Sequence, residues 1–167
     1  MKKRLLSLFL ILCMCGILSV PTFAATSFDA ESFDPLSLTE ISTDVEYFED
    51  GSYLVTTIKS SPTPRANVYT KTGTKEVTLY DEDNKVQWIY YLIGTFTIET
   101  GVSCVCTNST YSYEIYVNKW SMTEHDNWYS HNAAFGTATF KKKVLFITTS
   151  TQELEGAVWC DAYGVIS

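Results

Sequence analysis

The sequence predicts one all-β domain, an antiparallel β-sandwich or barrel-like fold of about 8–9 strands. From residue 45 to the C-terminus, short apolar runs rich in β-branched and aromatic residues alternate with turn residues. In Tyr111, Tyr113, Ile115 and Val117 the apolar residues recur at every second position, as a half-buried strand requires. No long stretch combines a 3.6-residue apolar period with helix-capping residues.

The first 24 residues are typical of a cleavable signal peptide. Lys2, Lys3 and Arg4 precede an apolar run over residues 5–20, and Thr22 and Ala24 are small residues at the two positions that signal peptidase reads. The run of roughly 16 residues is shorter than the roughly 20 that span a bilayer, so we expect no membrane span after the leader is cleaved. The sequence therefore predicts a secreted, extracellular product.

Charge limits the partners of that product. The leader holds three basic residues and no acidic one, so its removal takes the formal net charge from −7 to −10. Nucleic acids and anionic membrane surfaces are disfavoured as partners, because they are bound by neutralising negative charge. The three consecutive lysines at 141–143 are the local exception and are typical of a charged turn or strand edge.

Residues 25–44 differ in composition from the rest. They carry five acidic residues and no basic one, together with several Ser and Thr. Such a segment buries little apolar surface, so we expect a flexible acidic linker over 25–44 and a single sandwich domain over 45–167.

Turn residues divide the domain into its expected strands. Asp50-Gly51 predicts a two-residue hairpin turn, and the acidic stretch 81–84 predicts a second, solvated turn. The segment 86–98 is apolar on both faces, which indicates a strand inside the sheet. Strands are expected at 45–48, 53–58, 75–80, 86–98, 102–107, 111–117, 133–140, 144–149 and 154–162.

Three cysteines remain after the leader is removed. Cys104 and Cys106 are two residues apart and therefore share one strand face, and alternation places Cys160 on the inner face of the last strand. In an oxidising compartment, either member of the pair can bond to Cys160 across the core. The closed loop of roughly 55 residues would contribute about 4 kcal/mol to stability.

Several short motifs resemble small secreted β-rich proteins of Gram-positive, clostridial-type bacteria, a family of uncharacterised proteins. They are residues 69–73 (YTKTG), Trp88, 94–96 (GTF), 106–109 (CTNS), Trp120 and 136–138 (GTA). The resemblance covers about residue 45 to the C-terminus and implies a fold type and a compartment, but no activity and no catalytic residues. The family pattern has one cysteine in the middle strand. It therefore implies a Cys106–Cys160 disulfide and leaves Cys104 as a free thiol, buried as a small hydrophobic residue.

Candidate catalytic and metal-binding residues are few. His125-Asp126 could supply a base and its orienting group, but neighbouring residues rarely face each other, and a polar loop between Trp120 and Trp128 accounts for them better. The carboxylates at 81–83 could serve a glycosidase or a calcium site, but they fit a solvated hairpin turn better. The cysteines and histidines lack the spacing of a zinc site. We therefore expect no catalytic residues, no metal and no cofactor.

Aromatic residues are the one excess in the composition. Trp120, Trp128 and Tyr129 lie in or near the longest polar stretch, so we expect them to be surface aromatics that bind a ligand. The sequence thus predicts a secreted, non-catalytic binding module at or near the cell surface, with a glycan or a protein as its ligand. The alternatives are a bacteriocin-like effector that acts on other cells and, less well supported, a hydrolase.

Overall fold

The computed structural model describes residues 38–167, and their regular structure is entirely β-strand. The expected signal peptide and residues 25–37 of the expected linker lie outside the described residues. The eight strands are β1 (Thr39–Tyr47), β2 (Tyr53–Ser60), β3 (Val68–Tyr80), β4 (Val86–Glu99), β5 (Ser103–Ile115), β6 (Trp120–Ser130), β7 (Ala133–Val144) and β8 (Ile147–Trp159). No helix in this part of the chain could span a membrane.

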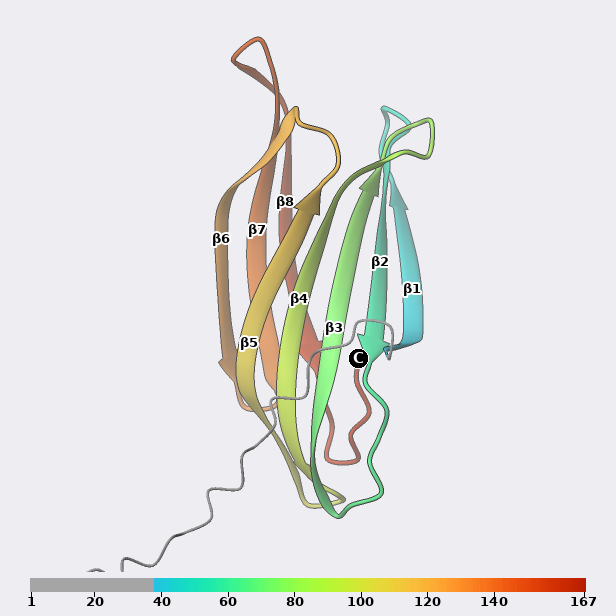
Figure 1. Ribbon diagram of the computed structural model, residues 1–167, viewed down its shortest axis with the longest axis vertical. Helices are drawn as coiled ribbons and strands as arrows, with labels where there is room; N and C mark the ends of the chain where they lie inside the picture. The colour runs from blue at the N-terminus through green and yellow to red at the C-terminus, as the bar shows by residue number, and fades with distance from the viewer. Residues whose placement is uncertain (1–37) are drawn as a thin grey trace, which may run out of the picture. The chain divides into compact units, whose positions relative to one another are not determined.

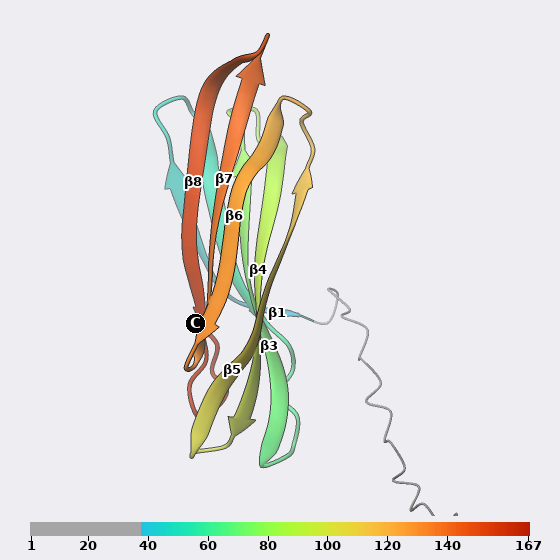
Figure 2. The same cartoon turned by 90° about the vertical axis from the view of Figure 1, so that its left-hand side faces the viewer.

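The strands form two antiparallel sheets that pack face to face (Figures 1 and 2). The first sheet has the order β1-β2-β3-β4-β5, and the second has the order β6-β7-β8. Each strand pairs with its neighbour in sequence, so the topology is a simple meander within each sheet. The predicted all-β sandwich and its strand number are confirmed.

Alternation of side chains builds the core between the sheets. Trp88 of β4 stacks on Phe140 of β7 with ring centroids 4.2 Å apart, and both side chains are fully buried. Along β4, residues with the parity of Trp88 face the second sheet, and from Ile89 onward those between them are half-buried or exposed. The expected position of 86–98 inside a sheet is confirmed, because β4 is paired on both edges.

Two pairs of glycines fix how closely the sheets approach. Gly73 and Gly94 face each other across β3 and β4, and a methyl group on Gly73 would lie 2.8 Å from Cγ1 of Val158. Gly136 and Gly156 face each other across β7 and β8, and a methyl group on Gly136 would lie 2.8 Å from Cδ1 of Leu92. Because real Cβ atoms essentially never approach so closely, each pair provides the space for side chains of the opposite sheet.

The two sheets meet at a seam between β5 and β6. The backbone N–H of Cys106 donates to the carbonyl oxygen of His131 at 2.7 Å. Farther along the seam, Nδ2 of Asn127 donates to the carbonyl oxygen of Ser109 at 2.5 Å. Most of this seam is joined by side chains, whereas backbone ladders join the strands within each sheet.

The structure differs from the expected strands in several places. Residues 39–44, expected in the flexible linker, pair with β2 as part of β1, whose residues are all exposed. Residues 120–130, expected as a polar loop, form β6. The expected runs 102–107 and 111–117 are one strand, β5, and β3 begins at Val68, before the expected run 75–80. The turn at residues 145–146 divides the expected run 144–149, whose second half forms one strand, β8, with most of the run 154–162. Polar residues outnumber apolar ones in β1 and β6 because both strands have a solvent-exposed face.

The hairpin predicted at Asp50-Gly51 is present, but its loop is longer than two residues. Phe48 and Ser52 close the loop through a backbone hydrogen bond of 2.9 Å, and Gly51 has a φ of 81°. The Asp50 side chain accepts a hydrogen bond from the backbone N–H of Ser52 at 3.1 Å. Hydrogen bonds from Ser52 hold the pKa of the Asp50 carboxyl below its usual value.

Candidate functional site

The expected surface aromatics separate into two groups. Trp128 and Tyr129 are exposed, with 43% and 52% of their surface accessible. The expectation that Trp120 is also at the surface is wrong, because only 6% of it is accessible. Trp120 is the first residue of β6, and its ring meets Trp88 edge to face at 6.2 Å. It is part of the core that joins the two sheets.

Trp128 belongs to a row of three aromatic residues on the outer face of the second sheet. Trp128 of β6 lies directly opposite Phe135 of β7, with ring centroids 5.5 Å apart and ring planes at 10°. Trp159 of β8 meets Phe135 edge to face at 5.5 Å. We call Trp128, Phe135 and Trp159 the aromatic row. It crosses all three strands, and both of its tryptophans are exposed.

Polar residues lie next to the aromatic row on the same face. Asp126 of β6 pairs with Thr137 of β7, which pairs with Glu155 of β8. Asp126 and Thr137 are each two residues away from a member of the row, Trp128 and Phe135 respectively. Because side chains two residues apart share a face of a sheet, the carboxylates and the hydroxyl point to the same side as the rings. This surface therefore offers aromatic rings for apolar groups and acceptor oxygens for hydroxyl groups.

Sequence reasoning missed Phe135 and Trp159 as members of this surface. A signal for Trp159 was present, since alternation places Val158 and Cys160 inside and must therefore turn Trp159 outward. Phe135 gave no such signal, because its place beside Trp128 depends on the pairing of β6 with β7.

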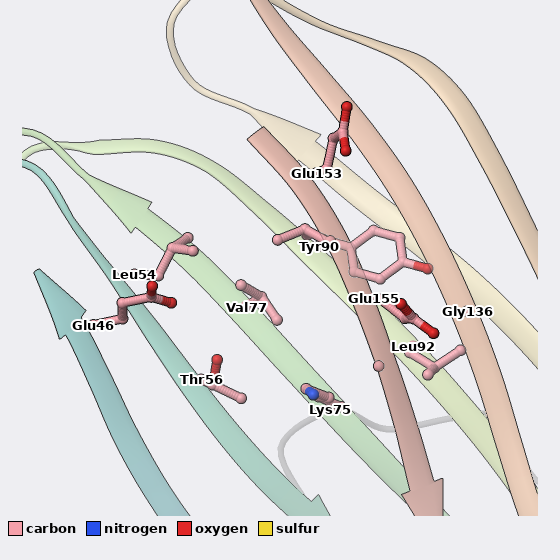
Figure 3. A pocket seen from close by; sticks show the side chains of 12 residues that line it. Glu46, Leu54, Thr56, Lys75, Val77, Tyr90, Leu92, Gly136, Glu153 and Glu155 are labelled. Atoms are coloured by element: carbon pink, nitrogen blue, oxygen red, sulfur yellow. The ribbon is translucent and has the colours of Figure 1, made fainter. Parts of the chain in front are cut away.

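A second candidate site is a cavity of about 230 Å³ between the two sheets (Figure 3). One wall carries Lys75 of β3 with Tyr90 and Leu92 of β4, and the other carries the paired glycines Gly136 and Gly156. The absence of side chains on these glycines lets Lys75, Tyr90 and Leu92 approach the backbone of the opposite wall closely. Its remaining lining residues are Glu46, Leu54, Thr56, Val77, Glu153, Leu154 and Glu155.

Two polar groups of this cavity lack partners. Only 3% of Tyr90 is accessible, and its hydroxyl group forms no hydrogen bond. Lys75 is half-buried, and within the described residues its amine forms neither an ion pair nor a hydrogen bond. Burial lowers the pKa of Lys75 and raises the pKa of Tyr90 to about 12, because each charged form loses hydration. Both groups can donate hydrogen bonds to an acceptor inside the cavity.

The residues considered for hydrolase chemistry lie elsewhere. His125 lies in β6, where its Nε2 is 2.6 Å from the hydroxyl group of Tyr111 in the β5–β6 seam. The expected loop for His125-Asp126 is therefore wrong, and neither residue lines the cavity.

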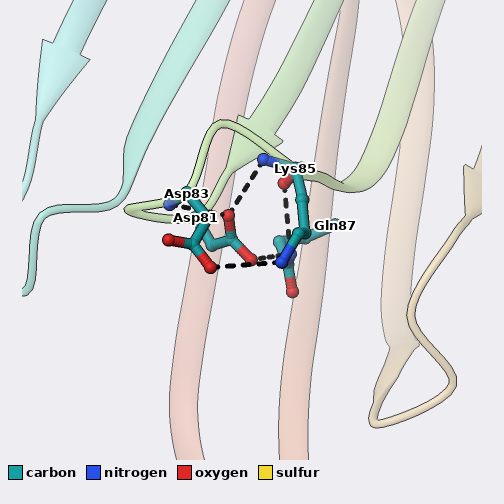
Figure 4. A network of polar contacts seen from close by, with 4 residues as sticks. All are labelled: Asp81, Asp83, Lys85 and Gln87. Atoms are coloured by element: carbon teal, nitrogen blue, oxygen red, sulfur yellow. Dashed lines mark hydrogen bonds and ion pairs between the residues drawn. The ribbon is translucent and has the colours of Figure 1, made fainter.

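The carboxylates at 81–83 lie in the β3–β4 turn, as expected (Figure 4). Asp81 accepts hydrogen bonds from the backbone N–H groups of Asp83 and Lys85 at 3.0 and 2.9 Å, and from Nε2 of Gln87 at 2.9 Å. These contacts fix the turn and occupy both oxygens of the carboxylate. Among residues 38–167, no group of three His, Cys, Asp or Glu side chains is arranged to hold a metal ion.

The three cysteines gather where the β6–β7 turn meets the end of β8. Cys104, Cys106 and Cys160 are free thiols in the structure, so the expected Cys106–Cys160 disulfide stays a prediction. Sγ of Cys160 donates to the carbonyl oxygen of Asp161 at 3.4 Å, and Sγ of Cys106 donates to the carbonyl oxygen of Asn108 at 3.3 Å. Burial raises the pKa of all three thiols, most strongly that of Cys160.

Comparisons of this chain with protein-family models, with curated proteins and with solved structures each gave no match.

Proposed function

We propose that this chain is a secreted, non-catalytic module that binds a glycan at or near the cell surface through the aromatic row. The observation that carries the proposal is the alignment of Trp128, Phe135 and Trp159 on one exposed sheet face. Sugar rings present apolar C–H faces that pack on aromatic rings, and they surround those faces with hydroxyl groups.

The neighbours of the aromatic row support a glycan over a protein as the ligand. Asp126, Thr137 and Glu155 supply acceptor oxygens beside the rings, which suits the many hydroxyl groups of a sugar. The leader-like N-terminus supports an extracellular setting in which such ligands occur.

Binding to a glycan array tests the proposal. We expect the wild-type protein to bind one class of polysaccharide, and Trp128→Ala and Trp159→Ala each to weaken that binding at least about tenfold, as loss of an aromatic anchor does. Tyr163→Ala is the matched control, because Tyr163 is an exposed aromatic residue outside the row. No binding to any glycan, or binding that survives both tryptophan substitutions, would contradict the proposal.

A secreted effector that acts on other cells is the second candidate function. It is favoured by a separate observation, the cluster of exposed apolar residues at the tip of the β7–β8 hairpin. Growth inhibition of neighbouring bacteria by the purified protein tests this candidate. If the purified protein inhibits no growth up to its limit of solubility, the effector function is ruled out.

A further inference from the structure

The β7–β8 hairpin ends in four consecutive apolar residues that contact no core. We call Val144, Leu145, Phe146 and Ile147 the apolar tip. Leu145 is 86% accessible and Phe146 is fully accessible, and their two neighbours are also exposed. Most large apolar side chains of a soluble domain are at least partly covered, so a contiguous exposed group of this kind marks an interaction site.

The backbone of the apolar tip is itself unusual. Leu145 and Phe146 have φ values of 48° and 71°, and they form the two-residue turn between β7 and β8. Such a turn favours Asn and Gly, because positive φ values cost bulky residues about 1–2 kcal/mol each. Two large apolar residues therefore occupy a position where the fold alone would favour small, polar ones.

Four lysines surround the base of the apolar tip. Lys141, Lys142 and Lys143 directly precede it in β7, and the backbone N–H of Lys143 donates to the carbonyl oxygen of Lys119 at 2.8 Å. We call these four residues the lysine collar. Lys142 lies over the ring of Trp120, with its amine 5.8 Å from the ring centroid. The collar is a local positive region on a chain whose net charge is −7.

The hairpin extends beyond the other loops at its end of the sandwich, as both views show (Figures 1 and 2). Those loops include the acidic turns at residues 49–50 and 81–83. A flat surface that approaches this end therefore meets the apolar tip first and the lysine collar next. The aromatic row lies near the opposite end of the same strands, so the two surfaces are separate.

We propose that the apolar tip inserts into the outer layer of a lipid bilayer that contains anionic lipids, with the lysine collar at the level of the headgroups. Interfacial segments bury their apolar side chains about 5–10 Å deep in the bilayer. The apolar tip is a two-residue turn with one strand residue on each side, and a strand rises about 3.3 Å per residue, so the length of the tip matches that depth. The lysines follow at once, at the depth where lipid phosphates lie. The negative net charge disfavours anionic membranes for the chain as a whole, but the lysine collar is locally positive and favours an anionic bilayer over an apolar protein groove as the partner of the tip. The proposal does not depend on the glycan-binding function.

Sedimentation with lipid vesicles tests this inference. The wild-type protein is compared with variants substituted in the hairpin and with a control variant substituted elsewhere. We expect partition into vesicles of phosphatidylcholine with phosphatidylglycerol, and weaker partition into phosphatidylcholine alone. Phe146→Glu should lower the partition at least about tenfold. Val102→Glu is the matched control and should leave it unchanged, because Val102 is an exposed apolar residue at the opposite end of the sandwich.

Two further variants separate the roles of the apolar tip and the lysine collar. Phe146→Trp should retain vesicle binding. When vesicles are added, the emission of the new tryptophan should shift to shorter wavelength, because its indole ring moves from water into an apolar environment. The double variant Lys141→Gln, Lys143→Gln should lose the preference for anionic vesicles. Failure of the wild-type protein to partition into either vesicle type would overturn the proposal. So would a dimer that Phe146→Glu dissociates without any vesicle binding, since the tip would then dock onto a second copy.

Discussion

Gly136 of β7 lies directly opposite Gly156 of β8, and the hydroxyl group of Tyr90 and the amine of Lys75 extend into the space beside them. A methyl group on Gly136 would lie 2.8 Å from Cδ1 of Leu92 and 2.9 Å from the hydroxyl oxygen of Tyr90. Both atoms belong to buried side chains that cannot easily move. Gly136→Ala should therefore reduce the free energy of unfolding by about 1–3 kcal/mol, as overpacking does.

Gly156→Ala is the matched substitution in the same pair. Its methyl group would meet chiefly the end of the Lys75 side chain, 2.8 Å from Nζ, and that flexible end can swing into solvent. We expect this variant to stay within about 0.5 kcal/mol of the wild type in urea unfolding. Equal losses for the two variants would contradict the close packing described for Gly136.

Lys75 should destabilise the fold at neutral pH, because its half-buried amine has no partner. Burial lowers the pKa of Lys75 in the folded state below the unfolded value of 10.5. The loss of stability caused by the buried charge is therefore complete below that lowered pKa, and it disappears as the pH rises toward 10.5 and the amine becomes neutral in both states. Lys75→Met should raise stability at pH 7 by no more than about 1 kcal/mol, since solvent still reaches the amine.

Urea unfolding of this variant from neutral to alkaline pH checks the sign. The gain of Lys75→Met should shrink as the pH approaches 10.5. Lys59→Met is the control, because Lys59 forms an ion pair with Glu76 and should give no gain. Destabilisation by Lys75→Met at pH 7 would show that the amine has a favourable partner.

Tyr90 should make the fold sensitive to alkali. Its pKa rises from 10.0 to about 12 on folding, because burial disfavours the phenolate. A raised folded-state pKa contributes stability that is present below pH 10 and is lost as the pH rises from about 10 to about 12. Tyr91, whose pKa is also raised to about 12, contributes to the same loss.

Tyr90→Phe distinguishes the contribution of Tyr90 to the alkaline loss of stability from that of Tyr91. It should remove part of the alkaline loss and raise stability at neutral pH by about 1 kcal/mol, because the buried hydroxyl group has no partner. Stability curves at several pH values measure both effects. An alkaline transition identical to that of the wild type would mean that Tyr90 does not stay protonated in the native state.

Oxidation should join Cys104, rather than Cys106, to Cys160. The neighbouring Cys104 thiol, and not Cys106, helps to raise the pKa of Cys160, while the Cys106 thiol donates to the Asn108 carbonyl group. The intact mass of Cys106→Ser should therefore be two hydrogens lighter than its reduced form, and that of Cys104→Ser should not. A disulfide that persists in Cys104→Ser would restore the pairing that the sequence resemblance implies.

Replacing the two turn residues of the apolar tip with residues that favour positive φ values should make the fold more stable. Leu145→Asn with Phe146→Gly supplies the residues that positive φ values favour, so the unfolding free energy should rise by about 1–2 kcal/mol. The same variant should lose vesicle partition if the tip enters a bilayer. Lower stability would show that Leu145 and Phe146 are held by packing.

The sequence was sufficient to predict the sandwich because its signals are local. The run that is apolar on both faces identified β4, alternation placed Cys160 on the inner face of the last strand, and Gly51 marked the first hairpin. The exposure of Trp128 and Tyr129 also followed from their polar surroundings. Each of these inferences depends on residues that are close together in the chain.

The candidate sites depend on contacts that local patterns do not contain. Trp120 has the polar neighbours of a surface residue, yet it is buried because β6 packs its first residue against Trp88. Phe135 joins the aromatic row only through the register of β6 on β7. Gly136 and Gly156 line the cavity together because they pair across two strands, which two isolated glycines in the sequence cannot reveal.

Glycan binding through the aromatic row is the central claim, and a tryptophan fluorescence titration tests it most directly. Trp128 and Trp159 are exposed, whereas Trp88 and Trp120 are buried, so a ligand on the row should change the emission of the exposed pair. We predict saturable quenching by a polysaccharide in the wild type and in Tyr163→Ala, and its loss in the double variant Trp128→Ala, Trp159→Ala. Equal quenching in the double variant would contradict the claim, because the ligand would then lie away from the row.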